Sequence, residues 1–195
     1  MTKDSKQPLS SHTAYIALYA DINGKSAEEL TNLIAKEIPQ HTHTLYLLIC
    51  TGGGSVEYGF ALYNFLRGLP YKIITHNMAN ADSIGNILML AGEERYATEN
   101  AVFLIHGVKS KIKDEKIALG FMEEKMSCIK SDEDRIHQTI LKHSNMKKEL
   151  LDNLSISGAV FTAQDALKCG LIHDIRKITI PSGANLFTVM ASVVE

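Results

Sequence analysis

Three segments of the sequence contain residues that could do chemistry together. Ser83 stands in "NMANADSIG", His106 closes the apolar run "AVFLIH", and glycines fill positions 52–54 in "LLICTGGGSVEYG". A serine hydroxyl can attack a carbonyl carbon when a histidine takes its proton. Backbone N–H groups can then stabilise the oxyanion that forms. The three segments therefore supply the residue types of a nucleophilic acyl-transfer site.

Ser83 and His106 each have a simpler interpretation. Ser83 follows small residues at 79–81 and opens a predicted helix, where a hydroxyl projects outward but where a serine, or Asp82 beside it, also serves as an N-cap. By itself the capping interpretation is the commoner one. His106 precedes Gly107 at the end of a predicted strand and could simply end that strand. The pair favours catalysis more than either residue alone, because both lie at strand ends.

The glycines indicate a close approach to the backbone. Consecutive glycines lose much conformational entropy on folding, so they suit a place where N–H groups must be reached. Gly53 or Gly54 could supply one oxyanion donor and Ile84 the other. The segment lacks the Lys-Ser/Thr of a phosphate-binding P-loop and the pattern GxGxxG. No cofactor and no metal are predicted, since the remaining histidines show no metal-ligand spacing.

The elements that must position these residues alternate along the chain. Strands are expected at 13–20, 44–50, 71–77 and 101–106, with helices between them at about 26–38, 55–69 and 82–92. Ser26 is the expected N-cap of the first helix, with Glu29 completing a capping box. Strands alternating with helices predict an α/β fold of repeated βαβ units with a mainly parallel sheet. Ligands of such sheets bind at the carboxyl ends of the strands, where the three segments fall.

A long charged helix follows at about 114–145, and it carries more apolar surface than one domain can cover. We therefore expect a projecting helix and a homo-oligomer held partly through it. The expected domains are a polar N-terminal lead at 1–12, a single domain at 13–180 and a C-terminal tail at 181–195.

The composition is that of a globular protein of one domain. The net charge of −2 gives no reason to expect a nucleic-acid or membrane partner. Three widely spaced cysteines and an N-terminus without an apolar run favour a cytoplasmic location.

The segments resemble those of a known family when they are taken in order. The stretches "LYLLICTGGGSVEYGFALYNFL", "NMANADSIGNILMLAG", "NAVFLIHGV" and "FTAQDALKCGLIHDI" resemble the Clp protease proteolytic subunit, ClpP, over roughly residues 14–175. The resemblance implies a ClpP/crotonase fold with a handle helix, and a serine peptidase that acts on peptides or unfolded polypeptides as a homo-oligomeric ring. It also implies an AAA+ unfoldase as a partner, although the short N-terminal segment weighs against one.

The resemblance also assigns roles to individual residues. Ser83 matches the nucleophile and His106 the general base, while Gly53 and Ile84 match the oxyanion-hole donors. The aspartate that completes the family's triad falls at Gly158, where this chain has no carboxylate. The third triad member is thus open among neighbouring polar residues, namely Asp152, Asn153, Ser155, Ser157 and Asp165.

Three functions follow from these observations. The leading one is a ClpP-like serine endopeptidase that forms an acyl-enzyme, with activity weakened by the missing aspartate. The second is a catalytically impaired scaffold or regulatory subunit that keeps the fold. The third is a crotonase-type enzyme acting on acyl-CoA thioesters through a similar oxyanion hole.

Overall fold

The computed structural model describes residues 12–110 and 118–190. The strands are β1 (Thr13–Tyr19), β2 (Thr44–Thr51), β3 (Lys72–Ala81), β4 (Glu94–Ala97), β5 (Val102–Ile105), β6 (Ala159–Thr162), β7 (Asp174–Ile175) and β8 (Asn185–Met190). The helices are α1 (Gly24–Lys36), α2 (Val56–Gly68), α3 (Gly85–Met89), α4 (Leu119–His143), α5 (Lys148–Ser157) and α6 (Ala163–Lys168).

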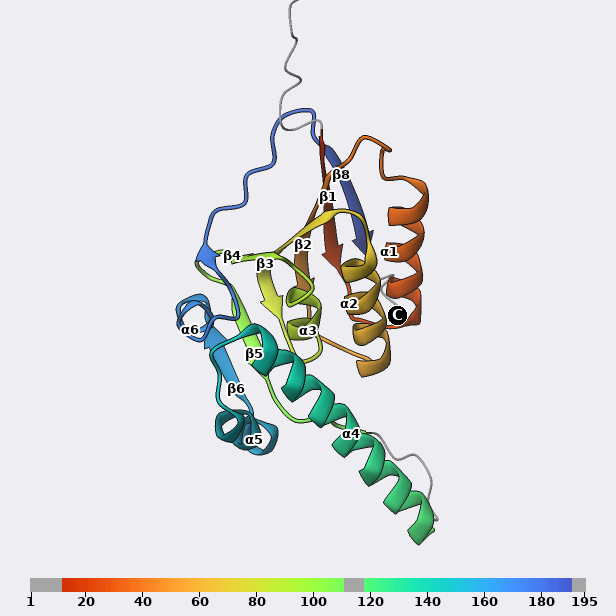
Figure 1. Cartoon of the computed structure of the whole chain (residues 1–195), viewed down its shortest axis with the longest axis vertical. Coiled ribbons are helices and arrows are strands. Elements are labelled where there is room, and N and C mark those ends of the chain that lie inside the picture. The colour runs from red at the N-terminus through yellow and green to blue at the C-terminus, as the bar shows by residue number, and fades with distance from the viewer. Residues whose placement is uncertain (1–11, 111–117, 191–195) are drawn as a thin grey trace, which may run out of the picture.

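The strands form one mixed sheet in the order β6-β5-β3-β2-β1-β8, with β4 pairing β3 and β7 (Figure 1). Every pairing is parallel except that of β5 with β6. Strand β3 changes its pairing partner along its length: Ile74–Asn77 pair with β4, whereas Asn80 pairs with Val102 of β5. The α/β fold with a mainly parallel sheet, predicted from the alternation of elements, is confirmed.

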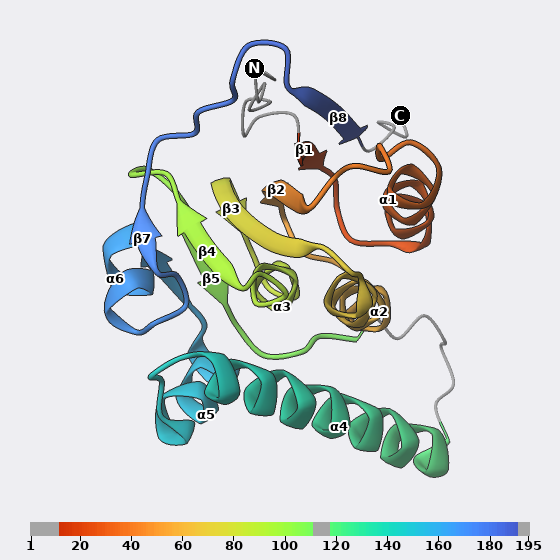
Figure 2. The same cartoon turned by 45° about the horizontal axis from the view of Figure 1, so that its top comes forward.

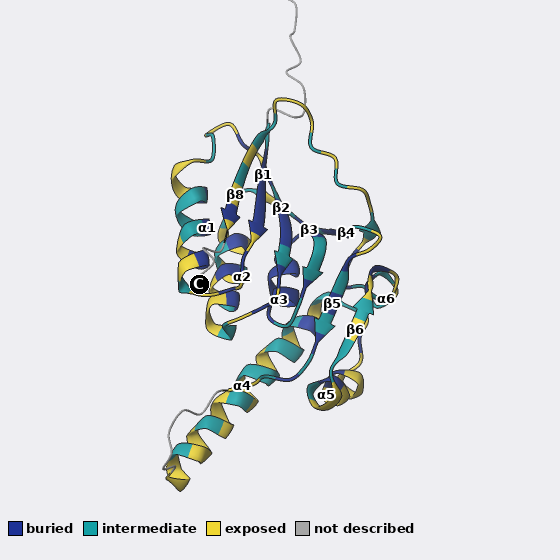
Figure 3. Ribbon diagram, turned by 180° about the vertical axis from the view of Figure 1, so that it is seen from behind, coloured by how far each residue is buried: buried dark blue, intermediate teal, exposed yellow. Residues whose placement is uncertain are grey.

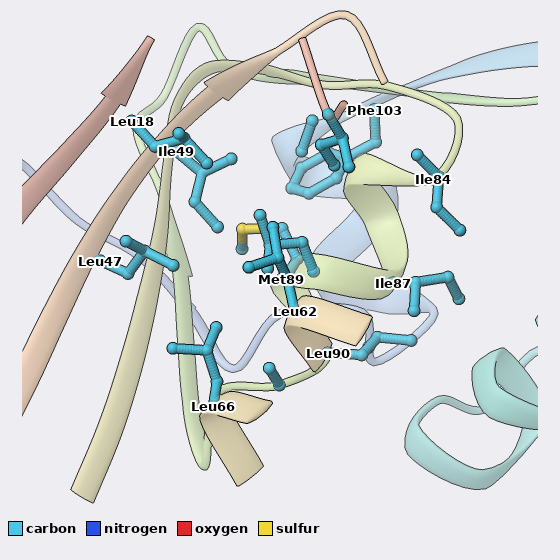
Figure 4. Packing of buried hydrophobic residues seen from close by; sticks show 14 of the residues in the cluster. Leu18, Leu47, Ile49, Leu62, Leu66, Ile84, Ile87, Met89, Leu90 and Phe103 are labelled. Atoms are coloured by element: carbon cyan, nitrogen blue, oxygen red, sulfur yellow. The ribbon is translucent and has the colours of Figure 1, made fainter. Parts of the chain in front are cut away.

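The core lies between the sheet and the helices α1, α2 and α3, which cover one of its faces (Figure 2). Side chains of β1, β2, α2, α3 and β5 gather there (Figure 4). The centre of β2 is a continuous apolar run, and Leu47, Leu48 and Ile49 are all buried. Burying one such side chain contributes roughly 1.5–3 kcal/mol. The buried strands seen in Figure 3 therefore hold their carboxyl ends in fixed relative positions.

The N-cap of the first helix lies three residues earlier than the sequence suggested. Its N-cap is Asn23, whose side chain accepts hydrogen bonds from the N–H groups of Lys25 and Ser26. Ser26 occupies the third helical position and returns a bond to the Asn23 N–H at 3.0 Å. The expected cap at Ser26 with Glu29 is wrong, because Asn23 is an equally good capping residue and precedes it.

Two further elements differ from the sequence-based expectation. The helix expected at 82–92 is only the short α3, and β4 follows it as an unpredicted strand. Within the segment 181–195, β8 pairs with β1 along its whole length and so belongs to the sheet.

Helix α4 extends well beyond the sheet at one end (Figure 1). Near its other end Ile140 is buried in the core, and the buried Arg95 side chain donates to the carbonyl oxygen of His143 at 3.0 Å. The exposed residues Leu119, Met122 and Met126 mark the projecting end. The long projecting helix is confirmed, and residues 114–117 of its predicted range lie outside the described residues.

Candidate active site

Ser83 lies in the turn between β3 and α3. Its φ of 55° is the only positive value for a non-glycine residue in the described ranges 12–110 and 118–190. Its N–H donates to the carbonyl oxygen of Leu104 in β5 at 2.7 Å. A residue held in this sparsely populated conformation needs surrounding structure to maintain it, and such strain is concentrated at functional sites. The turn thus has the character of a nucleophile elbow.

His106 follows the last residue of β5, and its ring is oriented by the backbone. Nδ1 lies 2.6 Å from the carbonyl oxygen of Gly107. A carbonyl oxygen only accepts, so Nδ1 carries the hydrogen and donates it. In the neutral ring the other nitrogen, Nε2, then has the free lone pair. That is the tautomer that a general base needs when it uses Nε2.

Ser83 and His106 line one cleft of about 240 Å³. The cleft is also lined by two glycines, by apolar residues of α2, β5, α4 and the segment after β5, and by two polar residues: Gly52, Gly54, Val56, Asn86, Ile105, Val108, Lys109, Ile136 and Ile140. The sequence-based expectation that Ser83 and His106 lie together is therefore met in position. The structure has no direct hydrogen bond between these two described side chains.

The two candidate donors in the glycine loop differ in whether their amides are already hydrogen-bonded. The Gly53 N–H donates to Thr51 Oγ1 at 3.1 Å, and the Gly53 carbonyl accepts from Ile22. Within the described part of the chain, the N–H groups of Gly54 and Ile84 have no acceptor. A Cβ at Gly54 would lie 2.1 Å from the Ile22 carbonyl oxygen, so only glycine fits there. Gly54 lines the cleft, which makes it the better-placed of the two candidates for an oxyanion donor.

Gly158 lies directly beside His106. A Cβ built on Gly158 would be 3.3 Å from the Cβ of His106. This is the position at which the resemblance places an aspartate, and the backbone there has φ 64° and ψ 156°. That region is accessible essentially to glycine alone. The position next to the histidine is thus occupied by a residue without a carboxylate, in a conformation that disfavours one.

Four of the five polar residues considered as substitutes have other partners for their side chains, and the fifth, Asn153, is exposed. Asp152 binds Lys148 at 2.7 Å, and Ser155 Oγ lies 3.0 Å from His137 Nε2. Ser157 Oγ donates to the carbonyl oxygen of Asn153. Asp165 accepts from Thr162 at the start of α6, which lowers the pKa of its carboxyl. Among described residues, none of the five forms a hydrogen bond with His106.

Two groups of the site were not found from the sequence. The Gly107 carbonyl orients His106, and the only signal was the glycine after the histidine. Asn86 lies one helical turn after Ser83 and donates to the carbonyl oxygens of Ser83 and Leu104. It was masked by the apolar residues around it, which made the segment look like an ordinary buried helix.

Groups of histidine, cysteine and acidic residues that could hold a metal ion are absent from residues 12–110 and 118–190. Among the described helices, none is long and apolar enough to cross a membrane.

The fold and the cleft define an α/β protein with a serine and a histidine at adjoining strand ends. The family model for Clp protease matches residues 4–179, and the chain belongs to this family. The ATP-dependent Clp protease proteolytic subunit 2 of Mycolicibacterium paratuberculosis is 30% identical over 175 residues, covering 86% of this chain and 85% of that protein. Subunit 1 of Leifsonia xyli is 27% identical, covering 83% and 82%.

The solved structure of a ClpP1 mutant from Listeria monocytogenes has a similar fold. Its TM-score is 0.70 at 20% identity, with 86% of this chain and 92% of that chain covered. The relatives named as proteolytic subunits support a ClpP-like protease.

Proposed function

We propose that this protein is a serine-type peptidase that cleaves peptides or unfolded polypeptides through an acyl-enzyme. The observation that carries the proposal is the pairing, in one cleft, of a serine in a strained turn with a histidine whose tautomer is fixed by Gly107. Membership of a family whose relatives are named as proteolytic subunits supports it.

The proposed reaction uses only groups of this chain. Ser83 Oγ attacks the peptide carbonyl carbon while its proton passes to His106 Nε2. The N–H groups of Gly54 and Ile84 donate to the oxyanion, since neither is engaged by another described group. The imidazolium then protonates the leaving amine, and water hydrolyses the acyl-serine ester through the same histidine. Gly53, the donor implied by the resemblance, would first have to release Thr51.

The Gly107 carbonyl takes over part of the role of the missing aspartate. It fixes the tautomer and orientation of the ring, which are the aspartate's main tasks. A neutral carbonyl stabilises the imidazolium less than a carboxylate would, because it carries only a partial negative charge. We therefore propose measurable but slow hydrolysis, at rates below those of an enzyme with a complete triad.

A catalytically impaired scaffold is the second candidate, and Gly158 favours it. The strained turn at Ser83 and the free amides weigh against it, because a scaffold has no need of either. We further propose a homo-oligomeric ring in which the exposed apolar end of α4 contacts another copy. The crotonase-type alternative would use the free amides alone, and it leaves the Ser83–His106 pair without a role.

Labelling with a fluorophosphonate probe tests the proposal. One label per chain is expected at Ser83, and none in Ser83→Ala. His106→Gln should slow labelling strongly, because the serine then lacks its base. Ser110→Ala is the matched control, since Ser110 is an exposed serine near the cleft, and it should be labelled like wild type. Label at another serine, or no label in wild type, would refute the peptidase proposal.

A further inference from the structure

Leu104, two residues before His106, is held on both of its backbone groups by the turn that carries Ser83. Its N–H donates to Asp82 Oδ1 at 3.0 Å. Its carbonyl oxygen accepts from the Ser83 N–H at 2.7 Å and from Asn86 Nδ2 at 2.9 Å. The serine turn and the strand leading to the histidine are therefore joined at a single residue.

The strand pairing alone does not make this connection. The register of β3 and β5 has one pair, Asn80 with Val102, after which β3 ends and the turn begins. Past that point the ladder is replaced by the hydrogen bonds to Leu104. The relative position of Ser83 and His106 thus depends on these few bonds rather than on a continuous sheet.

Asn86 is the side chain that links both sides of the junction. It is 3% exposed, and Nδ2 donates to the carbonyl oxygen of Ser83 at 3.0 Å as well as to that of Leu104. One amide group therefore bridges the carbonyl oxygens of the serine turn and the β5 strand. Two donors on a planar group also fix the spacing of the two acceptors, which a single hydrogen bond cannot do.

The other half of this amide is unsatisfied. Asn86 Oδ1 is buried and has no hydrogen-bond partner within the described residues. A buried acceptor without a partner destabilises the fold, whereas an apolar side chain in the same place would not. Such local violations are expected at functional sites. The asymmetry indicates that the useful part of Asn86 is its pair of donated bonds.

We propose that Asn86 is a positioning residue, which sets the separation of Ser83 and His106 by clasping the Ser83 turn to Leu104. We call the two hydrogen bonds from Asn86 Nδ2 to the carbonyl oxygens of Ser83 and Leu104 the clasp. The effect of Asn86 on the reaction rate rests on the proposed peptidase function, whereas the clasp itself does not. Asn86 lines the cleft but acts through the two backbone carbonyls that it binds. Removing it leaves both reacting side chains present and changes only their relative placement.

The first test compares Asn86→Ala with Asn77→Ala. Asn77 is the matched control, because it too is a buried asparagine and its Nδ2 donates to β5 at the Val102 carbonyl, 2.8 Å away. Asn86→Ala should lower the fluorophosphonate labelling rate and the peptidase kcat by on the order of 10- to 100-fold with KM little changed. Asn77→Ala should label at close to the wild-type rate, measured well below the unfolding temperature of each variant.

The second test does not need activity. Hydrogen exchange is followed in the peptide that contains the Ser83 amide, whose acceptor is Leu104. Asn86→Ala should raise exchange of that amide by about tenfold or more, while amides at the centre of β2 exchange as in wild type. Asn86→Ser, which keeps one donor, should give intermediate exchange and labelling, and it serves as the working variant if Asn86→Ala does not fold.

The outcomes separate the two proposals. If wild type is not labelled but exchange at Ser83 responds to Asn86→Ala, the peptidase proposal fails and the clasp stands. If wild type is labelled and Asn86→Ala labels at the same rate, the positioning role is overturned. Equal slowing by Asn77→Ala would also overturn it, because the effect would then be a general loosening of β5. Unchanged exchange at Ser83 would refute the clasp.

Discussion

Replacing Gly158 with aspartate tests the missing carboxylate directly. The Cβ of the new side chain would lie 3.3 Å from the Cβ of His106, so the carboxylate starts beside the ring that it would orient. The backbone at φ 64° and ψ 156° opposes this gain. Holding a residue other than glycine in that region costs about 1–3 kcal/mol. For a chain of this length, that cost lowers Tm by about 2–12 °C.

Gly158→Ala isolates the strain from the charge. Both variants should lose similar stability in thermal unfolding followed by circular dichroism, since both place a Cβ in the same strained position. Only Gly158→Asp should gain activity, because its carboxylate stabilises the imidazolium better than the Gly107 carbonyl does. We expect kcat of Gly158→Asp to exceed that of Gly158→Ala by about tenfold or more at a temperature where both are folded.

The two variants together test whether a carboxylate at position 158 assists His106 and whether the backbone there is strained. If Gly158→Asp is no faster than Gly158→Ala although both are folded, then the carboxylate does not reach His106 or the Gly107 carbonyl already suffices. If neither variant loses stability, the strain assigned to this backbone is wrong.

Two further predictions concern pH and assembly. Burial lowers the pKa of His76 from its ordinary 6.5 to about 4. The contribution of the neutral His76 ring to the free energy of unfolding is therefore complete above pH 6.5, and it is lost as the pH falls from 6.5 through 4. In urea unfolding, the free energy of unfolding should fall by about 3 kcal/mol between pH 6.5 and pH 4. His76→Gln should not show this fall, and an equal fall in that variant would contradict the prediction. On α4, Met122→Glu with Met126→Glu should lower the mass measured by light scattering, because it places charge on exposed apolar surface. A monomeric wild type at micromolar concentration would refute the oligomer.

The sequence was sufficient for the fold class and for the positions along the chain of the strands that carry the site. Buried strands appear as apolar runs and turns as glycine-rich or small-residue segments, and both are local patterns. The same reasoning placed Ser83 and His106 at strand ends, which the parallel sheet then brings to one edge. Local pattern was less reliable at Asn23 and Ser26, because both are good capping residues and only one begins the helix.

The tertiary structure decided the contacts whose partners are distant in sequence. Thr51 engages the Gly53 amide and leaves that of Gly54 without a partner, a distinction that three identical glycines cannot reveal. Gly158 lies beside His106 only because β6, which it precedes, pairs antiparallel with β5. Likewise, the Asn86 side chain meets Leu104 through the junction of β3 and β5. A hydrogen-bond partner is chosen by three-dimensional proximity, so the sequence could name the candidate residues of the site while only the folded chain determined what holds them.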